Sequence, residues 1–379
     1  MAGLKSGSTL KGGKYKIIRT LGQGSFGITY LASTRTVING ELGRMEVSVN
    51  VTVKEFFMSD LNSRSADGSS VEKTGSSLVK NYLSKFRREA ENLSRLNHPN
   101  IVKVLEVFEE NNTAYYVMEF IDGETLDDYI RSKGHLPEDE ALRIAGSVCS
   151  ALSYMHGHKM LHLDLKPKNI MLDSEGGIRL IDFGLAKQYN DKGEPESSTS
   201  LGLGTPGYAP VEQAQYKQDG TLPATLDIYA LGATLYKMLT GKTPPESSYI
   251  LNEGLPQEVL HQAGVSPGVV AVVTKAMAPL RKDRYPSVDA LQGAVAAMLS
   301  SAGGVGTGED TSYDTEREKK ASDSGFRKPV AEAGSHTPDA KPSSLKRYST
   351  LLVFCIAVAA FGILLFNLLS GGGTEAPDI

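Results

Sequence analysis

The sequence predicts an α+β fold in which strands come first and helices follow. Strand patterns lie near the N-terminus, at 15–21, 28–32 and 51–55. Apolar residues recur at helical spacing further along the chain, at 86–96, 138–156 and 286–299. After residue 300 the composition becomes polar, and a single long apolar run follows. We therefore expect one folded part, then a linker, then one hydrophobic segment.

A glycine-rich turn joins the first two of these strands. Gly22, Gly24 and Gly27 follow the pattern G-x-G-x-x-G. The pattern alone is weak evidence, because dinucleotide-binding loops share it. Those loops lead into a helix, whereas here the next segment, 28–32, has strand character. The arrangement favours a loop whose backbone N–H groups cover nucleotide phosphates, with a plain structural hairpin as the alternative.

A lysine lies in the middle of the third strand. Lys54 alternates with apolar neighbours, and its ammonium suits the α- and β-phosphates of a nucleotide. Glu89, within the helical segment 86–96, is its candidate ion-pair partner. Glu91 is the competing choice, but the frame set by His-Pro-Asn-Ile-Val at 98–102 favours Glu89.

The stretch between Lys54 and Glu89 contains an insertion, Ser59–Ser77, which is rich in Ser, Asn, Asp and Gly. This composition predicts a mobile surface loop. A docking or regulatory role and an inert insertion both remain open.

Two charged clusters in 160–184 have the spacing that phosphoryl transfer requires. Asp164 is followed by Lys166 and Asn169, and Asp182 begins an Asp-Phe-Gly turn further on. Transfer of a γ-phosphoryl group needs a carboxylate to orient the attacking hydroxyl, oxygen ligands for Mg²⁺ and positive charge on the phosphates. Asp164 suits the first task, Asn169 with Asp182 the second, and Lys166 the third.

With these motifs in this order, the chain resembles the protein kinase superfamily, and residues 13–300 correspond to one kinase domain. The resemblance implies a two-lobed fold, with a small antiparallel-sheet lobe and a larger helical lobe. It implies ATP and Mg²⁺ as cofactors, with Mn²⁺ as an alternative metal. The catalytic residues that it implies are Asp164, Lys166, Lys54 and Glu89, and the implied metal ligands are Asn169 and Asp182.

The resemblance also implies an adenine slot at the join of the lobes, formed by 115–123. Met118 would lie behind the adenine, and the backbone from Glu119 to Ile121 would bind its edge. Thr29 and Thr52 stand where the family usually has Val and Ala. The full set expected to bind ATP is Leu21, Gly22, Gly24, Gly27, Thr29, Thr52, Lys54, Met118, Glu119, Ile121 and Met171.

Three further positions bear on control and support of the site, and two of them depart from the family pattern. Leu163 replaces the arginine that in relatives pairs with a phosphorylated activation loop, so we expect little dependence on that switch. Glu212, in a Pro-Val-Glu variant of the Ala-Pro-Glu motif, is expected to pair with Arg284. Asp227 is expected to cap the backbone of the catalytic loop.

The substrate class follows from two positions. Lys166 and Thr205 match the serine/threonine branch, which implies protein substrates with Ser or Thr acceptors, and self-association for autophosphorylation is compatible with it. The runs Gly-Ile-Thr-Tyr-Leu-Ala (27–32) and Pro-Val-Glu-Gln (210–213) resemble bacterial kinases of the eukaryotic type. The alternatives are a pseudokinase scaffold that binds nucleotide at the membrane and a small-molecule kinase of related fold.

The C-terminal part predicts attachment to the cell membrane. Residues 301–349 lack the apolar side chains needed for a core, which predicts a disordered linker. Residues 350–369 carry no charge and match one bilayer core in length. Lys346 and Arg347 precede this span, so the positive-inside rule predicts a cytoplasmic kinase domain and a short extracytoplasmic tail, 370–379.

Composition excludes other classes of function. The net charge is −4, which gives no electrostatic support for nucleic-acid binding. Cys149 and Cys355 lie in different predicted parts of the chain, so neither a disulfide nor a cysteine metal site is indicated.

Overall fold

The computed structural model describes residues 3–24, 27–40, 43–72, 76–183, 187–188, 204–215 and 223–302. These residues belong to one compact unit within Met1–Glu309. The predicted linker beyond residue 302, the apolar span 350–369 and the tail 370–379 lie outside the described residues. Within the described ranges, no helix is both long and apolar enough to cross a membrane.

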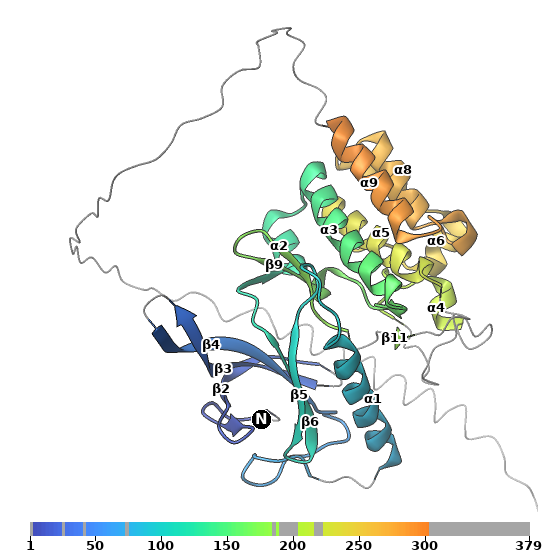
Figure 1. Ribbon diagram of the computed structural model, residues 1–379. Coiled ribbons are helices and arrows are strands. Elements are labelled where there is room, and N and C mark those ends of the chain that lie inside the picture. Colours follow the sequence, from blue (N-terminus) through green and yellow to red (C-terminus); the bar gives the residue numbers. More distant parts are fainter. Residues whose placement is uncertain are drawn as a thin grey trace, which may run out of the picture. The chain divides into compact units, whose positions relative to one another are not determined.

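The N-terminal lobe is a six-stranded antiparallel sheet with the order β1-β2-β3-β4-β6-β5 and one long helix (Figure 1). Its elements are β1 (Thr9–Leu10), β2 (Tyr15–Gln23), β3 (Gly27–Gly40), β4 (Gly43–Phe56), α1 (Ser77–Leu93), β5 (Val104–Glu110) and β6 (Thr113–Glu119). The lobe agrees with the predicted strands and contains the predicted helix, which begins earlier than expected.

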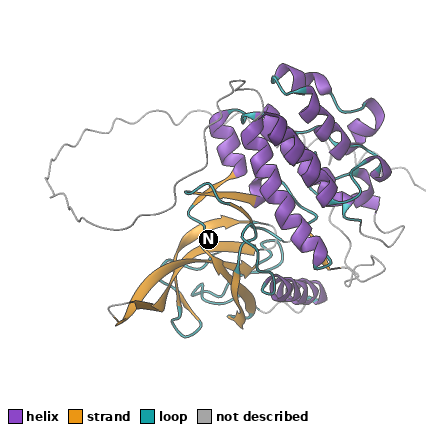
Figure 2. Cartoon of the chain, turned by 45° about the horizontal axis from the view of Figure 1, so that its top comes forward, coloured by secondary structure: helices purple, strands orange, loops and turns teal. Residues whose placement is uncertain are grey.

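The second lobe is mainly helical, and Figure 2 shows its helices gathered on one side of the strands. Its helices are α2 (Leu126–Lys133), α3 (Glu138–Gly157), α4 (Val211–Gln215), α5 (Thr225–Thr240), α6 (Ser247–Glu253), α7 (Gln257–Gln262), α8 (Pro267–Ala276) and α9 (Val288–Ala302). Its short strands are β7 (Gly123–Thr125), β8 (Met160–Leu161), β9 (Ile170–Asp173), β10 (Ile178–Leu180) and β11 (Lys187–Gln188). The α+β class and the two lobes are therefore confirmed.

The β3–β4 hairpin is longer than the sequence predicts. Its pairing runs from Gly27 opposite Phe56 to Gly40 opposite Gly43. The outer part of the hairpin is exposed, with Val37 at 54% relative exposure. Because it packs against no core, its sequence does not need the alternation of apolar and polar residues that identifies a half-buried strand. Only the inner part, which the sequence predicts, contributes to the site.

Two apolar cores flank the sheet. On one face, Phe86 and Ala90 of α1 belong to a large core that continues through α3, α5, α8 and α9. On the other face, a second core contains Tyr30, Tyr115, Leu4 and Val71. Because alternate residues of a strand point to opposite faces, neighbouring residues of β4 belong to different cores.

Candidate active site

The predicted catalytic residues of the second lobe converge on the Asp164 carboxylate. Lys166 Nζ donates to Asp164 Oδ2 at 2.7 Å, and Thr205 Oγ1 donates to Oδ1 at 2.7 Å. Lys166 Nζ also donates to Thr205 Oγ1 at 2.8 Å, which closes a triangle. Asn169 Nδ2 donates to the Asp164 backbone oxygen at 2.8 Å and to Oδ2 at 3.1 Å. A carboxylate held in this way faces one direction and keeps a lysine beside it.

The loop that carries Asp164 is held from below by buried polar groups. Asp227, which is fully buried, accepts the backbone N–H of His162 at 2.9 Å and of Leu163 at 2.8 Å. Gln213 Nε2 donates to the Leu163 carbonyl oxygen at 2.9 Å. Leu163 has φ of 65°, a left-handed conformation that costs energy for a non-glycine residue and persists because these contacts fix it. The expected capping role of Asp227 is present.

Lys54 and Asp182 join the two lobes. Lys54 Nζ donates to Asp182 Oδ1 at 2.6 Å, and the lysine side chain is 18% exposed. Burial disfavours the charged ammonium, but the Asp182 carboxylate outweighs it, and the pKa of Lys54 is raised. The predicted ion pair differs, because in the described residues Lys54 pairs with Asp182 and not with Glu89. Asp182 of the second lobe is thus the ion-pair partner of Lys54, the role that the sequence predicts for Glu89 of α1.

Glu89 of α1 nevertheless lies within electrostatic reach of Lys54. Burial raises the pKa of Glu89 to about 8, Lys54 acts in the opposite direction, and Asp182 adds to the increase. Without a direct ion pair, the positive charge of Lys54 does not offset the loss of water around this carboxyl group.

The raised pKa of Glu89 predicts a pH-dependent stability. The folded protein keeps this proton up to about pH 8, whereas the ordinary carboxyl pKa is 4.5. Between these values the folded state binds more protons than the unfolded state, so stability falls as pH rises. Glu89→Gln is expected to flatten the urea-unfolding free energy across pH 5 to 8. The exposed neighbour provides the control, Glu91→Gln; an unchanged slope in Glu89→Gln would contradict the assignment.

The glycine-rich turn lies between β2 and β3, beside Lys54. Gly24 donates its N–H to the Gly27 carbonyl oxygen at 2.9 Å, and Ser25 and Phe26 lie outside the described residues. A Cβ at Gly27 would lie 2.6 Å from the Glu55 carbonyl oxygen and 3.7 Å from Lys54 Cε. Gly27 therefore allows the turn to approach the strand that carries the lysine.

The residues predicted for the adenine slot lie on three neighbouring strands and the segment after β6. Thr29 pairs with Lys54 across β3 and β4, and Thr52 pairs with Met118 across β4 and β6. Met118 and Ile121 pack against the larger core. The other predicted residues have these positions: Leu21 and Gly22 in β2, Glu119 at the end of β6, and Met171 in β9.

Glu212 and Arg284 form the predicted pair in the second lobe. Arg284 Nη1 and Nη2 donate to Glu212 Oε1 at 2.5 Å and Oε2 at 3.2 Å. The guanidinium also donates to the carbonyl oxygens of Thr225, Ala278 and Pro279. This saturated arginine fastens the end of the segment that carries Thr205 to the helical lobe.

The described part of the insertion, 59–72, is held to the sheet by contacts that the prediction of a mobile surface loop does not include. Residues 58–72 fold back onto the sheet, where Val71 is 3% exposed and belongs to the second core. The Val71 N–H donates to the Asn111 carbonyl oxygen at 2.9 Å, and Asn112 Nδ2 donates to the Val71 carbonyl oxygen at 3.0 Å. Arg64 and Val71 anchor the segment to the sheet. Their contacts are not predictable from the sequence, because each is a single residue in a polar segment without a periodic apolar pattern.

A cavity of about 650 Å³ adjoins the Asp164 triangle on the side of α2 and α5. Lys166 and Thr205 line it together with Lys168, Arg131 and Lys237. Because it lies beside Lys166 and Thr205, which contact Asp164, it is a candidate for binding the substrate chain around the acceptor hydroxyl.

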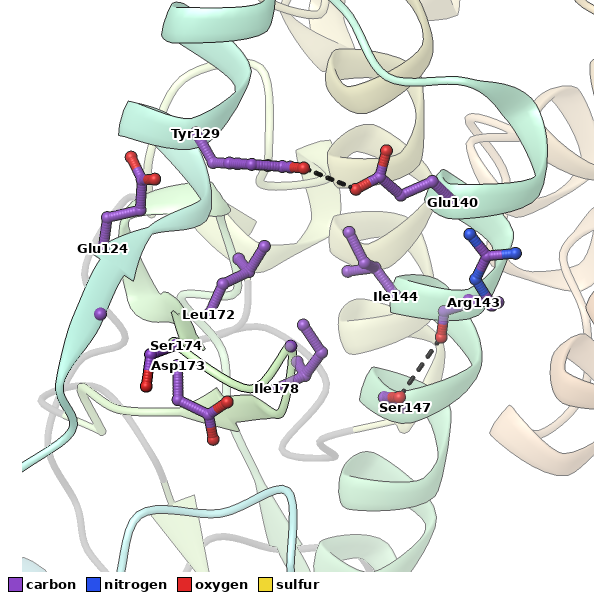
Figure 3. A pocket seen from close by; sticks show the side chains of 12 residues that line it. Glu124, Tyr129, Glu140, Arg143, Ile144, Ser147, Leu172, Asp173, Ser174 and Ile178 are labelled. Atoms are coloured by element: carbon purple, nitrogen blue, oxygen red, sulfur yellow. Dashed lines mark hydrogen bonds between the residues drawn. The ribbon is translucent and has the colours of Figure 1, made fainter. Parts of the chain in front are cut away.

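A second cavity, of about 610 Å³, lies between α2, α3 and the β9–β10 hairpin (Figure 3). Tyr129 of α2 donates to Glu140 Oε1 of α3 at 2.8 Å along its edge. Ile144, Leu172 and Ile178 provide its apolar wall. No residue predicted for the active site lines this cavity, so it is separate from the candidate site.

Comparisons with known proteins agree with this geometry. Residues 69–281 match the protein kinase domain family. The chain is 35% identical over 213 residues to the serine/threonine-protein kinase PknB of Mycobacterium tuberculosis (strain ATCC 25177 / H37Ra), covering 53% of this chain and 33% of the relative. It is 30% identical over 294 residues to the probable serine/threonine-protein kinase PknB of Lactococcus lactis, covering 76% and 42% respectively.

A third relative, the serine/threonine-protein kinase PrkC of Bacillus subtilis (strain 168), is 33% identical over 232 residues, which cover 61% of this chain and 31% of the relative. The chain thus spans between 31% and 42% of the length of these three curated relatives. The family match begins after the glycine-rich turn and Lys54, so the assignment of these two features is supported by the geometry of the N-terminal lobe.

Proposed function

The chain belongs to the protein kinase domain family, and on that premise we propose that it transfers the γ-phosphoryl group of ATP to Ser and Thr hydroxyls of proteins. The observation that carries the proposal is the Asp164–Lys166–Thr205 triangle. It offers a carboxylate oriented toward an incoming hydroxyl and an ammonium within 2.7 Å of that carboxylate. Phosphoryl transfer depends mostly on such positioning and on charge stabilisation.

Each residue has a defined role in the proposed reaction. Asp164 orients the acceptor hydroxyl and takes its proton, and Lys166 stabilises the negative charge on the transferred group. Lys54 holds the α- and β-phosphates, and the backbone between Gly22 and Gly27 covers them. Glu89, which does not contact Lys54 here, is proposed to hold the lysine once Asp182 engages metal.

The donor set of Asn169 and Asp182 suits Mg²⁺, with Mn²⁺ as the alternative. Asn169 directs its Nδ2 to Asp164, so its own amide oxygen, Oδ1, is left to serve as a metal ligand. The side chain of Asp182 is 46% exposed. Oxygen ligands of this type are those that Mg²⁺ prefers. When bound, the ion neutralises charge on the phosphates. The two residues lie on either side of the β9–β10 hairpin, and the Ile181 N–H donates to the Asn169 carbonyl oxygen at 3.0 Å.

ADP release, measured with and without Mg²⁺ and with a protein acceptor, tests the proposal. Turnover that requires the ion and yields phosphorylated protein is the expected result. A pseudokinase scaffold would bind ATP without turnover, and a small-molecule kinase would leave protein unlabelled.

We further propose that acceptor proteins carry acidic residues near the phosphorylated Ser or Thr. Arg131 is neutralised by Asp127 at 2.7 Å and Asp128 at 2.8 Å. Lys168 and Lys237 line the same cavity, and in the described part of the chain neither forms an ion pair with a carboxylate. The cavity therefore has excess positive charge.

Paired peptides test this preference. A Thr peptide with Glu on both sides is expected to have a kcat/KM about three to five times that of its Lys counterpart, as befits exposed charge pairs. Lys168→Glu is expected to remove the difference. Lys242→Glu, at an exposed residue outside the cavity lining, is the matched control. Equal rates for both peptides with the unmodified protein would disprove the preference.

We also propose that the kinase domain, 13–300, is cytoplasmic and is held at the cell membrane by 350–369, through the linker 301–349. The support is the uncharged length of that segment and the cations Lys346 and Arg347 before it. Deletion of 350–379 is expected to move the protein from the membrane fraction to the supernatant. Recovery of the shortened protein with the membranes would contradict the anchor.

A further inference from the structure

The insertion between β4 and α1 closes over a buried carboxylate. Glu55 of β4 is fully buried, and the side chain of Arg64, from the insertion, is 6% exposed. Arg64 Nη2 forms an ion pair with Glu55 Oε2. The guanidinium also lies 5.1 Å from the centre of the Phe57 ring. A pair so deeply buried requires further hydrogen bonds to offset its loss of water.

Those hydrogen bonds come from the neighbouring strands. Tyr30 of β3 donates its hydroxyl to Glu55 Oε2 at 2.6 Å, and Tyr115 of β6 donates to Oε1 at 2.9 Å. The Tyr30 hydroxyl in turn accepts the Leu4 N–H at 3.0 Å and Arg64 Nη2 at 3.2 Å. One carboxylate thus links β3, β4, β6, the insertion and the N-terminal segment.

This network lies directly behind Lys54. Glu55 follows Lys54 in β4, so the carboxylate points into the second core while the ammonium points to Asp182. The Glu55 carbonyl oxygen also packs against Gly27, at the end of the glycine-rich turn. A displacement of Glu55 would therefore move both groups that are proposed to hold the phosphates.

We propose that Arg64 is a positioning residue for nucleotide binding: it holds the Glu55 carboxylate in the core and so fixes the place of Lys54 and Gly27. The inference rests on the proposed function, because Lys54 is taken to bind the phosphates of ATP. The insertion is then a working part of the nucleotide site, and it acts through the contact of Arg64 with Glu55.

Loss of the guanidinium leaves a buried carboxylate without its cation. Such a group takes up a proton or turns toward water, and either change loosens the strand that carries it. The tyrosine hydroxyls donate to Glu55 but bring no positive charge, so they do not replace Arg64. Strand β4 then shifts at Glu55, directly beside Lys54, and the affinity for ATP falls.

The experiment compares KM for ATP, and the dissociation constant of ATP from equilibrium dialysis, in the full chain and its variants. Arg64→Met removes the positive charge at similar side-chain volume, and Glu55→Gln removes the negative charge of its partner. Arg64→Lys keeps the charge, and the double variant Arg64→Met with Glu55→Gln removes both charges. Val270→Ala, in the buried part of α8, is the control for a loss of stability distant from the network.

Arg64→Met alone, or Glu55→Gln alone, is expected to raise KM for ATP and the dissociation constant of ATP at least about fivefold, with a smaller change in kcat. Arg64→Lys and the double variant are expected to remain within about twofold of the unmodified protein. If one single variant does not fold, the other still gives the comparison.

Two results would overturn the proposal: single variants that lose thermal stability but keep the unmodified affinity for ATP, or a double variant as impaired as the single ones. A failure of the proposed function looks different. In that case the unmodified protein transfers no phosphate, while the dialysis comparison still reports on Arg64.

Discussion

Replacing Asp164 with Asn is expected to lower kcat for protein phosphorylation by about 10³-fold, within the range that a general base contributes. Asn keeps the shape, but its single side-chain oxygen can accept only one of the two hydrogen bonds that Lys166 and Thr205 donate to Asp164. It also cannot take a proton from the acceptor. KM for ATP is expected to change little, because the nucleotide is held mainly by the other lobe.

Steady-state kinetics with a saturating protein acceptor measures this effect. Asp139→Asn is the matched control, since Asp139 is an exposed carboxylate paired with Arg143 on α3. The control is expected to keep activity within about twofold. If Asp164→Asn retained more than about a tenth of the activity, another residue would have to orient the acceptor.

The second large effect is on stability. Glu212→Gln leaves the Arg284 side chain, which is fully buried, without its carboxylate. Removal of one partner of a buried ion pair costs about 3 kcal/mol or more, because the remaining charge cannot regain its water. The three carbonyl oxygens that also accept from Arg284 reduce this cost without removing it.

Urea unfolding monitored by circular dichroism measures the loss. The exposed pair Asp139–Arg143 provides the comparison, and its disruption is expected to cost less than about 1 kcal/mol. A loss below about 1 kcal/mol in Glu212→Gln would show that the other contacts of Arg284 suffice.

The sequence predicted the parts of the site whose spacing is fixed by local structure. Asp164, Lys166 and Asn169 lie within one short loop, and the structure brings them together with Thr205 as expected. The helices α3 and α9 are also predicted, because apolar residues recur at helical spacing along 138–156 and 286–299. Such features depend on residues that are neighbours in the sequence or recur at one period.

The sequence failed where a contact depends on how two distant segments meet. Lys54 pairs with Asp182 from the other lobe, although the sequence predicts Glu89 as its partner. The insertion folds onto the sheet through Arg64, whose partner Glu55 is buried by strands on both sides. Neither contact leaves a periodic pattern, and a Ser- and Gly-rich composition favours a loop on average.

The most direct test of the central claim is identification of the residues that receive phosphate. The full chain is incubated with labelled ATP, Mg²⁺ and protein acceptors, beside Asp164→Asn, and the phosphorylated residues are identified by mass spectrometry. The proposed function predicts label on Ser and Thr that disappears in the variant. Binding of ATP without label on protein, or label on Tyr alone, would contradict it.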